Sequence, residues 1–166
     1  MGEESKAKWE GKATIELAGN KVEQVWPHLE DFLNFHKLIP LDVCYKVEGV
    51  PNQPGLIRYC AAIIKGDDGS AEPTTNWANE KLLEIDPIQH SLTYEVGENN
   101  MGFKHYVATM KVLPINNEAE AGGCKIEWGF VSDPVEGWSL QDLNSYLQST
   151  LEFMAKKIEA ACSKAT

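Results

Sequence analysis

The chain has 166 residues and is most simply one domain, 1–166, which would bury about 70% of the surface of the unfolded chain, with both ends frayed. Its formal net charge of −10 argues against a nucleic-acid partner, because nucleic acids select a basic face. No apolar run approaches the ~20 residues that cross a bilayer. We therefore expect neither nucleic-acid binding nor membrane insertion.

The cysteine pattern bears on the compartment of the protein. The four cysteines are far apart and none forms a C-x-x-C motif: Cys44, Cys60, Cys124 and Cys162. This spacing fits reduced thiols in an intracellular protein better than a disulfide framework or a zinc site. The first residues show neither the apolar segment of a secretory signal nor a myristoylation pattern. We therefore predict a cytoplasmic protein.

The first third of the chain predicts one strand and two helices. Residues 9–17 alternate between apolar and polar side chains, as in a half-buried strand. A helix is expected to begin at Asn20, with Glu23 completing its N-terminal cap. Pro27 lies inside this helix and should kink it, because proline removes one backbone hydrogen bond. A short second helix is expected at residues 32–38.

Between residues 43 and 131 the hydrophobic period becomes two, which predicts antiparallel strands joined by turns. The expected strands cover residues 43–48, 56–64, 77–85, 91–96, 105–113 and 125–131. The polar connection 66–76 is long for a hairpin and is therefore a candidate functional loop.

The last predicted element is a long helix at residues 139–161. Ser139 and Asp142 have the spacing of a capping box at its start. One face carries an apolar stripe at helical spacing: Leu140, Leu143, Leu147, Leu151, Met154 and Ile158. Such a stripe needs a broad apolar partner, which the strands can supply. We therefore predict an α+β fold in which a curved antiparallel sheet of six to seven strands wraps around this helix.

Strand parity places several polar side chains inside. Arg58 alternates in step with Leu56 and Cys60, so its guanidinium is expected on the apolar face. Glu80 is ambiguous, because apolar residues occupy both faces of its strand. A buried charge is costly unless it is paired, so an inward Arg58–Glu80 pair is either a structural bridge or a functional site. The residues alone leave both open.

Other candidates are weaker. Tyr94 and Tyr106 each share a face with apolar neighbours on their strands. Cys60 is either a thiol with a low pKa or, more commonly, a small buried apolar filler. The histidines lack the spacing of metal ligands, so no metal is expected: His28, His36, His90 and His105.

Segments along nearly the whole chain carry a further signal. They are KWEGK (8–12), EQVW (23–26), DFLNFHK (31–37), VEG (47–49), GLIRY (55–59), WANEKL (77–82), YVATM (106–110) and PVEG (134–137). In these segments the chain resembles helix-grip proteins of the START, birch-pollen-allergen and plant abscisic-acid-receptor superfamily. Within that superfamily it most resembles the lachrymatory-factor synthases.

The resemblance implies a cavity between sheet and helix, with the catalytic arginine and glutamate at Arg58 and Glu80 and two ligand-binding tyrosines at Tyr94 and Tyr106. It also implies an isomerase that moves a proton from oxygen to carbon in an alkenyl sulfenic acid, with no cofactor. A carboxylate can shuttle that proton while arginine and phenol groups orient the oxygen. We expect a small apolar ligand with one polar end, bound either by such an isomerase or by a non-catalytic carrier or sensor of a hydrophobic plant metabolite.

The chain also departs from its relatives. It differs from the synthases at Pro27, in the loop 66–76 and at Phe103, and these positions bear on the choice of substrate. The gate and latch of the abscisic-acid receptors are missing, since residues 68–73 read DGSAEP and residues 100–103 read NMGF. Abscisic-acid-dependent phosphatase binding is therefore not expected.

Overall fold

The computed structural model describes residues 8–64, 73–115 and 123–164. Along the chain the elements are β1 (Trp9–Leu17), α1 (Val22–Glu30), the 3₁₀ helix η1 (Phe32–Lys37), β2 (Val43–Glu48), β3 (Ile57–Ile64), β4 (Thr74–Asp86), β5 (Ser91–Asn99), β6 (Tyr106–Pro114), β7 (Cys124–Ser132) and α2 (Leu140–Lys164). Most of the predicted functional loop, residues 66–72, lies outside the described residues.

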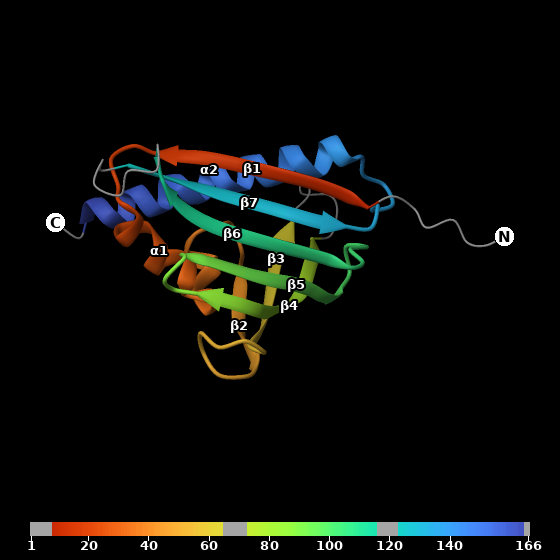
Figure 1. Cartoon of the computed structure of the whole chain (residues 1–166). Helices are drawn as coiled ribbons and strands as arrows, with labels where there is room; N and C mark the ends of the chain where they lie inside the picture. The colour runs from red at the N-terminus through yellow and green to blue at the C-terminus, as the bar shows by residue number, and fades with distance from the viewer. Residues whose placement is uncertain (1–7, 65–72, 116–122, 165–166) are drawn as a thin grey trace.

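The strands form one antiparallel sheet in the order β1-β7-β6-β5-β4-β3-β2. Strands β2 to β7 make the predicted meander, and β1 adds to its far edge by pairing with β7 from Trp9↔Ser132 to Leu17↔Cys124. The sheet curves, and α2 runs lengthwise along β1 (Figure 1). The predicted helix-grip fold is confirmed, with seven strands.

The two α-helices begin differently from one another. At α2, Asp142 N–H donates to Ser139 Oγ at 3.0 Å, and Asp142 Oδ2 accepts from Ser139 N–H at 2.9 Å, so the predicted capping box is confirmed. The predicted cap of α1 is wrong by one residue. There the Gln24 side chain accepts from Lys21 N–H at 2.8 Å, and the helix begins at Val22. Gln24 takes the bridging role because its amide oxygen can reach back three residues just as a glutamate can.

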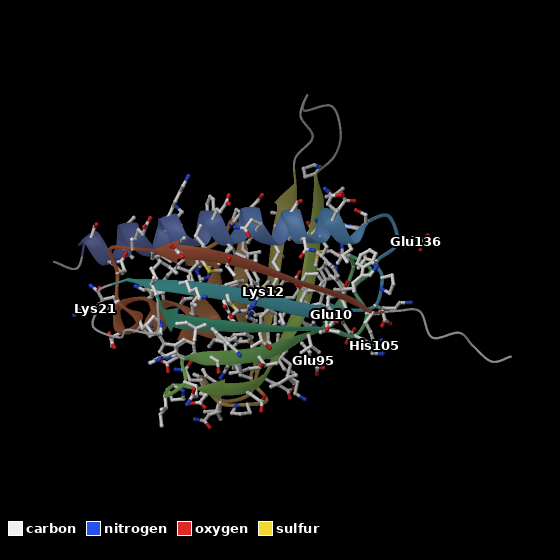
Figure 2. All side chains as sticks on the ribbon, turned by 45° about the horizontal axis from the view of Figure 1, so that its top comes forward. Glu10, Lys12, Lys21, Glu95, His105 and Glu136 are labelled. Carbon is white, nitrogen blue, oxygen red and sulfur yellow. The ribbon has the colours of Figure 1, made fainter. Side chains whose placement is uncertain are left out.

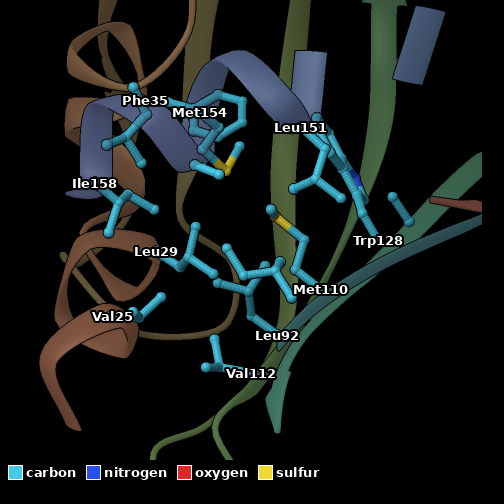
Figure 3. Close-up of a cluster of buried hydrophobic side chains, with 14 of the residues drawn as sticks. Val25, Leu29, Phe35, Leu92, Met110, Val112, Trp128, Leu151, Met154 and Ile158 are labelled. Atoms are coloured by element: carbon cyan, nitrogen blue, oxygen red, sulfur yellow. The ribbon is translucent and has the colours of Figure 1, made fainter. Parts of the chain in front are cut away.

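The core lies between the inner face of the sheet and the helices. Side chains from α1, η1, β5, β6, β7 and α2 meet there, as Figure 3 shows for Leu29, Leu92, Trp128 and Leu151. The predicted stripe of α2 is buried from Leu143 to Ile158. Burial of aliphatic side chains contributes roughly 1.5–3 kcal/mol each, so this stripe is a main source of stability.

The outer face of β1 is polar, and one glycine of this strand sets how closely α2 approaches its inner face. Glu10 and Lys12 of β1 are exposed on the outside (Figure 2). Between them, Gly11 faces α2, and a Cβ added there would lie 2.0 Å from Asn144 Oδ1. Glycine at this position therefore lets α2 pack directly on β1. None of the helices in the described part of the chain combines the length and apolar character that a membrane span requires.

Candidate ligand cavity

A cavity of about 560 Å³ lies between the inner face of the sheet, η1 and α2. Its walls are mostly apolar, with Ala78, Trp128 and Leu147 among the lining residues. The polar side chains of the lining are Cys60, Asn76, Glu80, Tyr94, Tyr106, Tyr146 and Thr150. Among the described residues Glu80 is the one charged side chain of the wall. The space suits a small ligand that is apolar over most of its surface.

Arg58 and Glu80 are direct cross-strand partners on β3 and β4. Glu80 Oε1 accepts a hydrogen bond from Arg58 Nε at 2.9 Å and lies 2.6 Å from Nη2. The third guanidinium nitrogen, Nη1, donates to the backbone oxygen of Phe32 at 2.7 Å. The Glu80 side chain therefore lies on the inner face of the sheet, as the resemblance implied, and the buried Arg58 holds its carboxylate in place.

Arg58 itself is 1% exposed and does not line the cavity, whereas the Glu80 side chain is 16% exposed. The Arg58 guanidinium carbon lies 3.6 Å from the centre of the Phe32 ring and 4.3 Å from that of Phe35, in cation–π contact. Burial is the largest single effect on Arg58 and opposes its charge, but the Glu80 carboxylate together with the nearby Cys60, Tyr94 and Cys44 groups outweighs burial and raises the pKa of Arg58. Arg58 is therefore a buried cation that contacts Glu80, and it is Glu80 that lines the cavity.

The two predicted tyrosines both lie on the cavity wall, 3% and 6% exposed. Tyr94 Oη accepts a hydrogen bond from Trp128 Nε1 at 3.2 Å, which leaves its own O–H free to donate. The Tyr106 ring stacks on Phe130, with ring centres 5.5 Å apart. Burial, followed by the nearby charge of Glu80, raises the pKa of both phenols, so both remain protonated donors at neutral pH.

Cys60 also lines the cavity, and its Sγ lies 3.9 Å from Glu80 Oε1 and 3.6 Å from Cys44 Sγ. The hydrogen bond with Cys44 and burial raise the pKa of Cys60, so a low-pKa thiol at this position is wrong. The lowered pKa belongs to Cys44, at about 6. Its main cause is the hydrogen bond from Cys60, with further contributions from the charge of Arg58 and from His36.

Sequence reasoning missed four contributors to this site: Phe32, Phe35, Trp128 and Cys44. Trp128 had a usable signal, because it alternates in step with the apolar Ile126 and Phe130. The two phenylalanines had none, because their contact with Arg58 joins η1 to a strand far along the chain. Within the described ranges, no three histidine, cysteine or acidic side chains are grouped as a metal site would need.

Comparison with known proteins identifies the family to which this fold belongs. The sequence profile of the polyketide cyclase / dehydrase and lipid transport family matches residues 8–163. The chain belongs to this family. The match runs from β1 into α2, and it supports a helix-grip protein that binds a hydrophobic ligand.

Three solved bacterial structures share the fold of this family member. The protein XoxI from Bacillus cereus is 18% identical with a TM-score of 0.65, covering 92% of this chain and 94% of its own. An uncharacterized protein from Bacillus thuringiensis is 16% identical with a TM-score of 0.65, covering 90% and 98%. A protein from Nitrosospira multiformis is 18% identical with a TM-score of 0.69, covering 90% and 95%. At this identity the similarity shows the fold alone.

Proposed function

We propose that this protein binds a small apolar molecule with one polar end and isomerises it by proton transfer, in the manner of the lachrymatory-factor synthases that it resembles. The observation that carries the proposal is the position of Glu80. Its carboxylate lies on the wall of an apolar cavity of about 560 Å³, with one oxygen held by a buried arginine. A carboxylate at such a place can accept a proton from a bound ligand and return it.

The proposed reaction converts an alkenyl sulfenic acid into a thial S-oxide. Glu80 takes the proton of the substrate O–H group and delivers it to the terminal carbon of the C=C–S unit. The O–H bond breaks, a C–H bond forms, and the carbon–carbon double bond becomes a carbon–sulfur double bond. The proton stays within one molecule overall, so the chemistry requires neither a metal nor an organic cofactor.

In this scheme the tyrosines hold the substrate oxygen and Arg58 acts through Glu80. The Tyr94 and Tyr106 hydroxyls are protonated donors on the wall, suited to an oxygen on which negative charge develops. Arg58 is 1% exposed and its hydrogen bonds go to Glu80 and the Phe32 carbonyl, so it is a positioning residue. Arg58 fixes the orientation of the Glu80 carboxylate relative to the ligand.

A second candidate function is that of a carrier or sensor for a hydrophobic metabolite, in which Glu80 only anchors a polar head group. The chemistry of the cavity wall favours this second function. Among the described lining residues Glu80 is the one charged side chain, so the wall offers no cation that could pair with an acidic ligand. Such a carrier would select ligands that bear a hydroxyl or amine donor. From the cysteine spacing and from residues 68–73 and 100–103 we further propose a cytoplasmic protein with reduced cysteines that takes no part in abscisic-acid-dependent phosphatase binding.

The two candidates separate in one assay. An alkenyl sulfenic acid is generated fresh in the presence and absence of the wild-type protein, and the thial S-oxide is quantified. The isomerase predicts product well above the background without protein. Product at the background level, together with saturable binding of an environment-sensitive dye, would defeat the sulfenic-acid reaction and leave the carrier.

A further inference from the structure

Two cysteines face each other at the edge of the cavity wall. Cys44 on the edge strand β2 and Cys60 on β3 are direct antiparallel partners, and their Sγ atoms are 3.6 Å apart. Both thiols are free. Cys44 is partly exposed, while Cys60 is buried and lines the cavity. Of the two thiols, Cys44 is therefore the more accessible to a small reagent.

We propose that Cys44 and Cys60 form an oxidation site, at which a peroxide converts the two thiols into a disulfide. The Cys44 thiolate attacks one oxygen of hydrogen peroxide, the O–O bond breaks, and the leaving hydroxide takes from solvent the proton that Cys44 had released, so that a sulfenic acid and one water are formed. The Cys60 sulfur then attacks the Cys44 sulfur, the S–O bond breaks, and the leaving hydroxide takes the Cys60 proton as a second water. The two sulfurs lose two electrons, and these reduce one peroxide to two waters.

Geometry permits the bond. Directly opposed residues on antiparallel strands have Cα atoms about 4.5–5.5 Å apart, within the range that a disulfide spans. The sulfurs must approach by about 1.5 Å from their present separation to reach bonding distance. Since β2 is an edge strand paired on one side only, it can take up a small adjustment without disturbing a second neighbour.

The environments of the two thiols assign their roles. The hydrogen bond with Cys60, followed by the charge of the buried Arg58 and by His36, lowers the pKa of Cys44 to about 6, which makes it a thiolate at neutral pH. Cys60 stays a thiol in its buried position. The partly exposed Cys44 thiolate is thus the nucleophile, and the buried Cys60 thiol is the resolving group. The other two cysteines, Cys124 and Cys162, are buried, and burial raises the pKa of both.

Oxidation would alter the cavity directly. Cys60 Sγ forms part of the wall and lies 3.9 Å from Glu80 Oε1, where its S–H can donate weakly. The disulfide removes that donor and draws the sulfur toward β2. The affinity of the cavity would then differ between the reduced and oxidised protein, whether or not the cavity is catalytic.

The experiment treats reduced wild-type protein with hydrogen peroxide, alkylates the remaining thiols under denaturing conditions, and maps the peptides. We expect the loss of two alkylatable thiols, the loss of the mass of two hydrogen atoms, and a linked peptide pair containing Cys44 and Cys60. Thiol loss at Cys44 should be at least ~10-fold faster than at Cys124, whose pKa is about 11. The Cys124→Ser/Cys162→Ser variant should give the same link, and Cys44→Ser should give none.

Three results would overturn the proposal. They are four intact thiols at peroxide levels that oxidise free glutathione, oxidation of Cys44 to a sulfinic acid with no linked peptide, and a link between any other pair of cysteines. The wild-type peptide map decides among these results by itself, so the test does not depend on the folding of a serine variant. Saturable dye binding measured before and after oxidation then reports the effect on the cavity, and an unchanged affinity would overturn the coupling to Cys60.

Discussion

Glu80 meets Arg58 through a single oxygen. Oε1 accepts from Nε at 2.9 Å and lies 2.6 Å from Nη2, and Cys60 Sγ approaches the same atom at 3.9 Å. Among the described residues Oε1 makes all of the hydrogen bonds of this carboxylate, which leaves Oε2 for a ligand. The pair is therefore both a structural bridge and a candidate reactive group, two alternatives that sequence reasoning had kept separate.

Removal of the arginine should destabilise the protein strongly. Arg58→Met leaves the Glu80 carboxylate without its cation and the Phe32 carbonyl without its donor, so we expect a loss of about 3–5 kcal/mol in the free energy of unfolding. Urea denaturation followed by circular dichroism measures it. The double variant Arg58→Met/Glu80→Gln should lose less than Arg58→Met alone, because no charge is then left unpaired. A single-variant loss below ~1 kcal/mol would show that the pair is solvated.

The stripe of α2 should carry much of the stability of the fold. Leu151 is fully buried and does not line the cavity, so Leu151→Ala should cost about 2–5 kcal/mol, the usual range for a core leucine. Lys156→Ala, on the exposed face of the same helix, is the matched control and should change stability by less than ~0.5 kcal/mol. Equal effects of the two substitutions would contradict the packing of α2 against the sheet.

A bulky side chain on the wall should block ligand binding. Ala62 on β3 lines the cavity, and Ala62→Phe adds a ring to a space of about 560 Å³. We expect an increase of ~10-fold or more in the Kd of an environment-sensitive dye, since a loss of about 1.4 kcal/mol already gives that factor. Thr75→Phe places the same ring at an exposed position of β4 and should leave the Kd unchanged. Equal Kd values for both variants would place the dye outside the cavity.

The reactivity of Cys44 should depend on pH in a recognisable way. Its pKa of about 6 lies below the ordinary thiol value, so the reactive thiolate forms as the pH rises through about 6. The rate of iodoacetamide alkylation at Cys44 should be half-maximal near that pH and level above pH 7, as followed by peptide mass spectrometry. The Cys44→Ser variant identifies the contribution of this residue. A rate that still climbs between pH 8 and 9 would show an ordinary thiol.

Local rules predicted the parts of this structure that depend on neighbours in sequence. Alternation placed Arg58 and Cys60 on the inner face of β3, and both are buried. The capping box placed the start of α2 at Ser139. These features follow from strand and helix geometry, which a single segment carries by itself.

Register and long-range contacts could not be predicted in the same way. Irregularities between Ala78 and Glu80 and between Leu82 and Glu84 shift the pairing of β4 with β5, and such bulges leave no simple pattern in the sequence. A further shift, after Lys46, sets which residue of β3 faces Cys44. The prediction that Glu80 lies on the inner face of the sheet came from the resemblance to known proteins and not from the alternation of apolar and polar residues.

The central claim is that Glu80 moves the proton, and Glu80→Gln tests it most directly. The amide keeps the size of the side chain and its hydrogen bond with Arg58 but removes the basic oxygen. With an alkenyl sulfenic acid as substrate, turnover should fall by ~10²–10⁴-fold, the usual contribution of a general acid–base, while the dye Kd changes much less. Glu84→Gln, on the exposed face of the same strand, is the matched control and should behave as the wild type. Turnover retained by Glu80→Gln within a factor of ~2 would contradict the account, because RT ln 2 is only about 0.4 kcal/mol of the barrier.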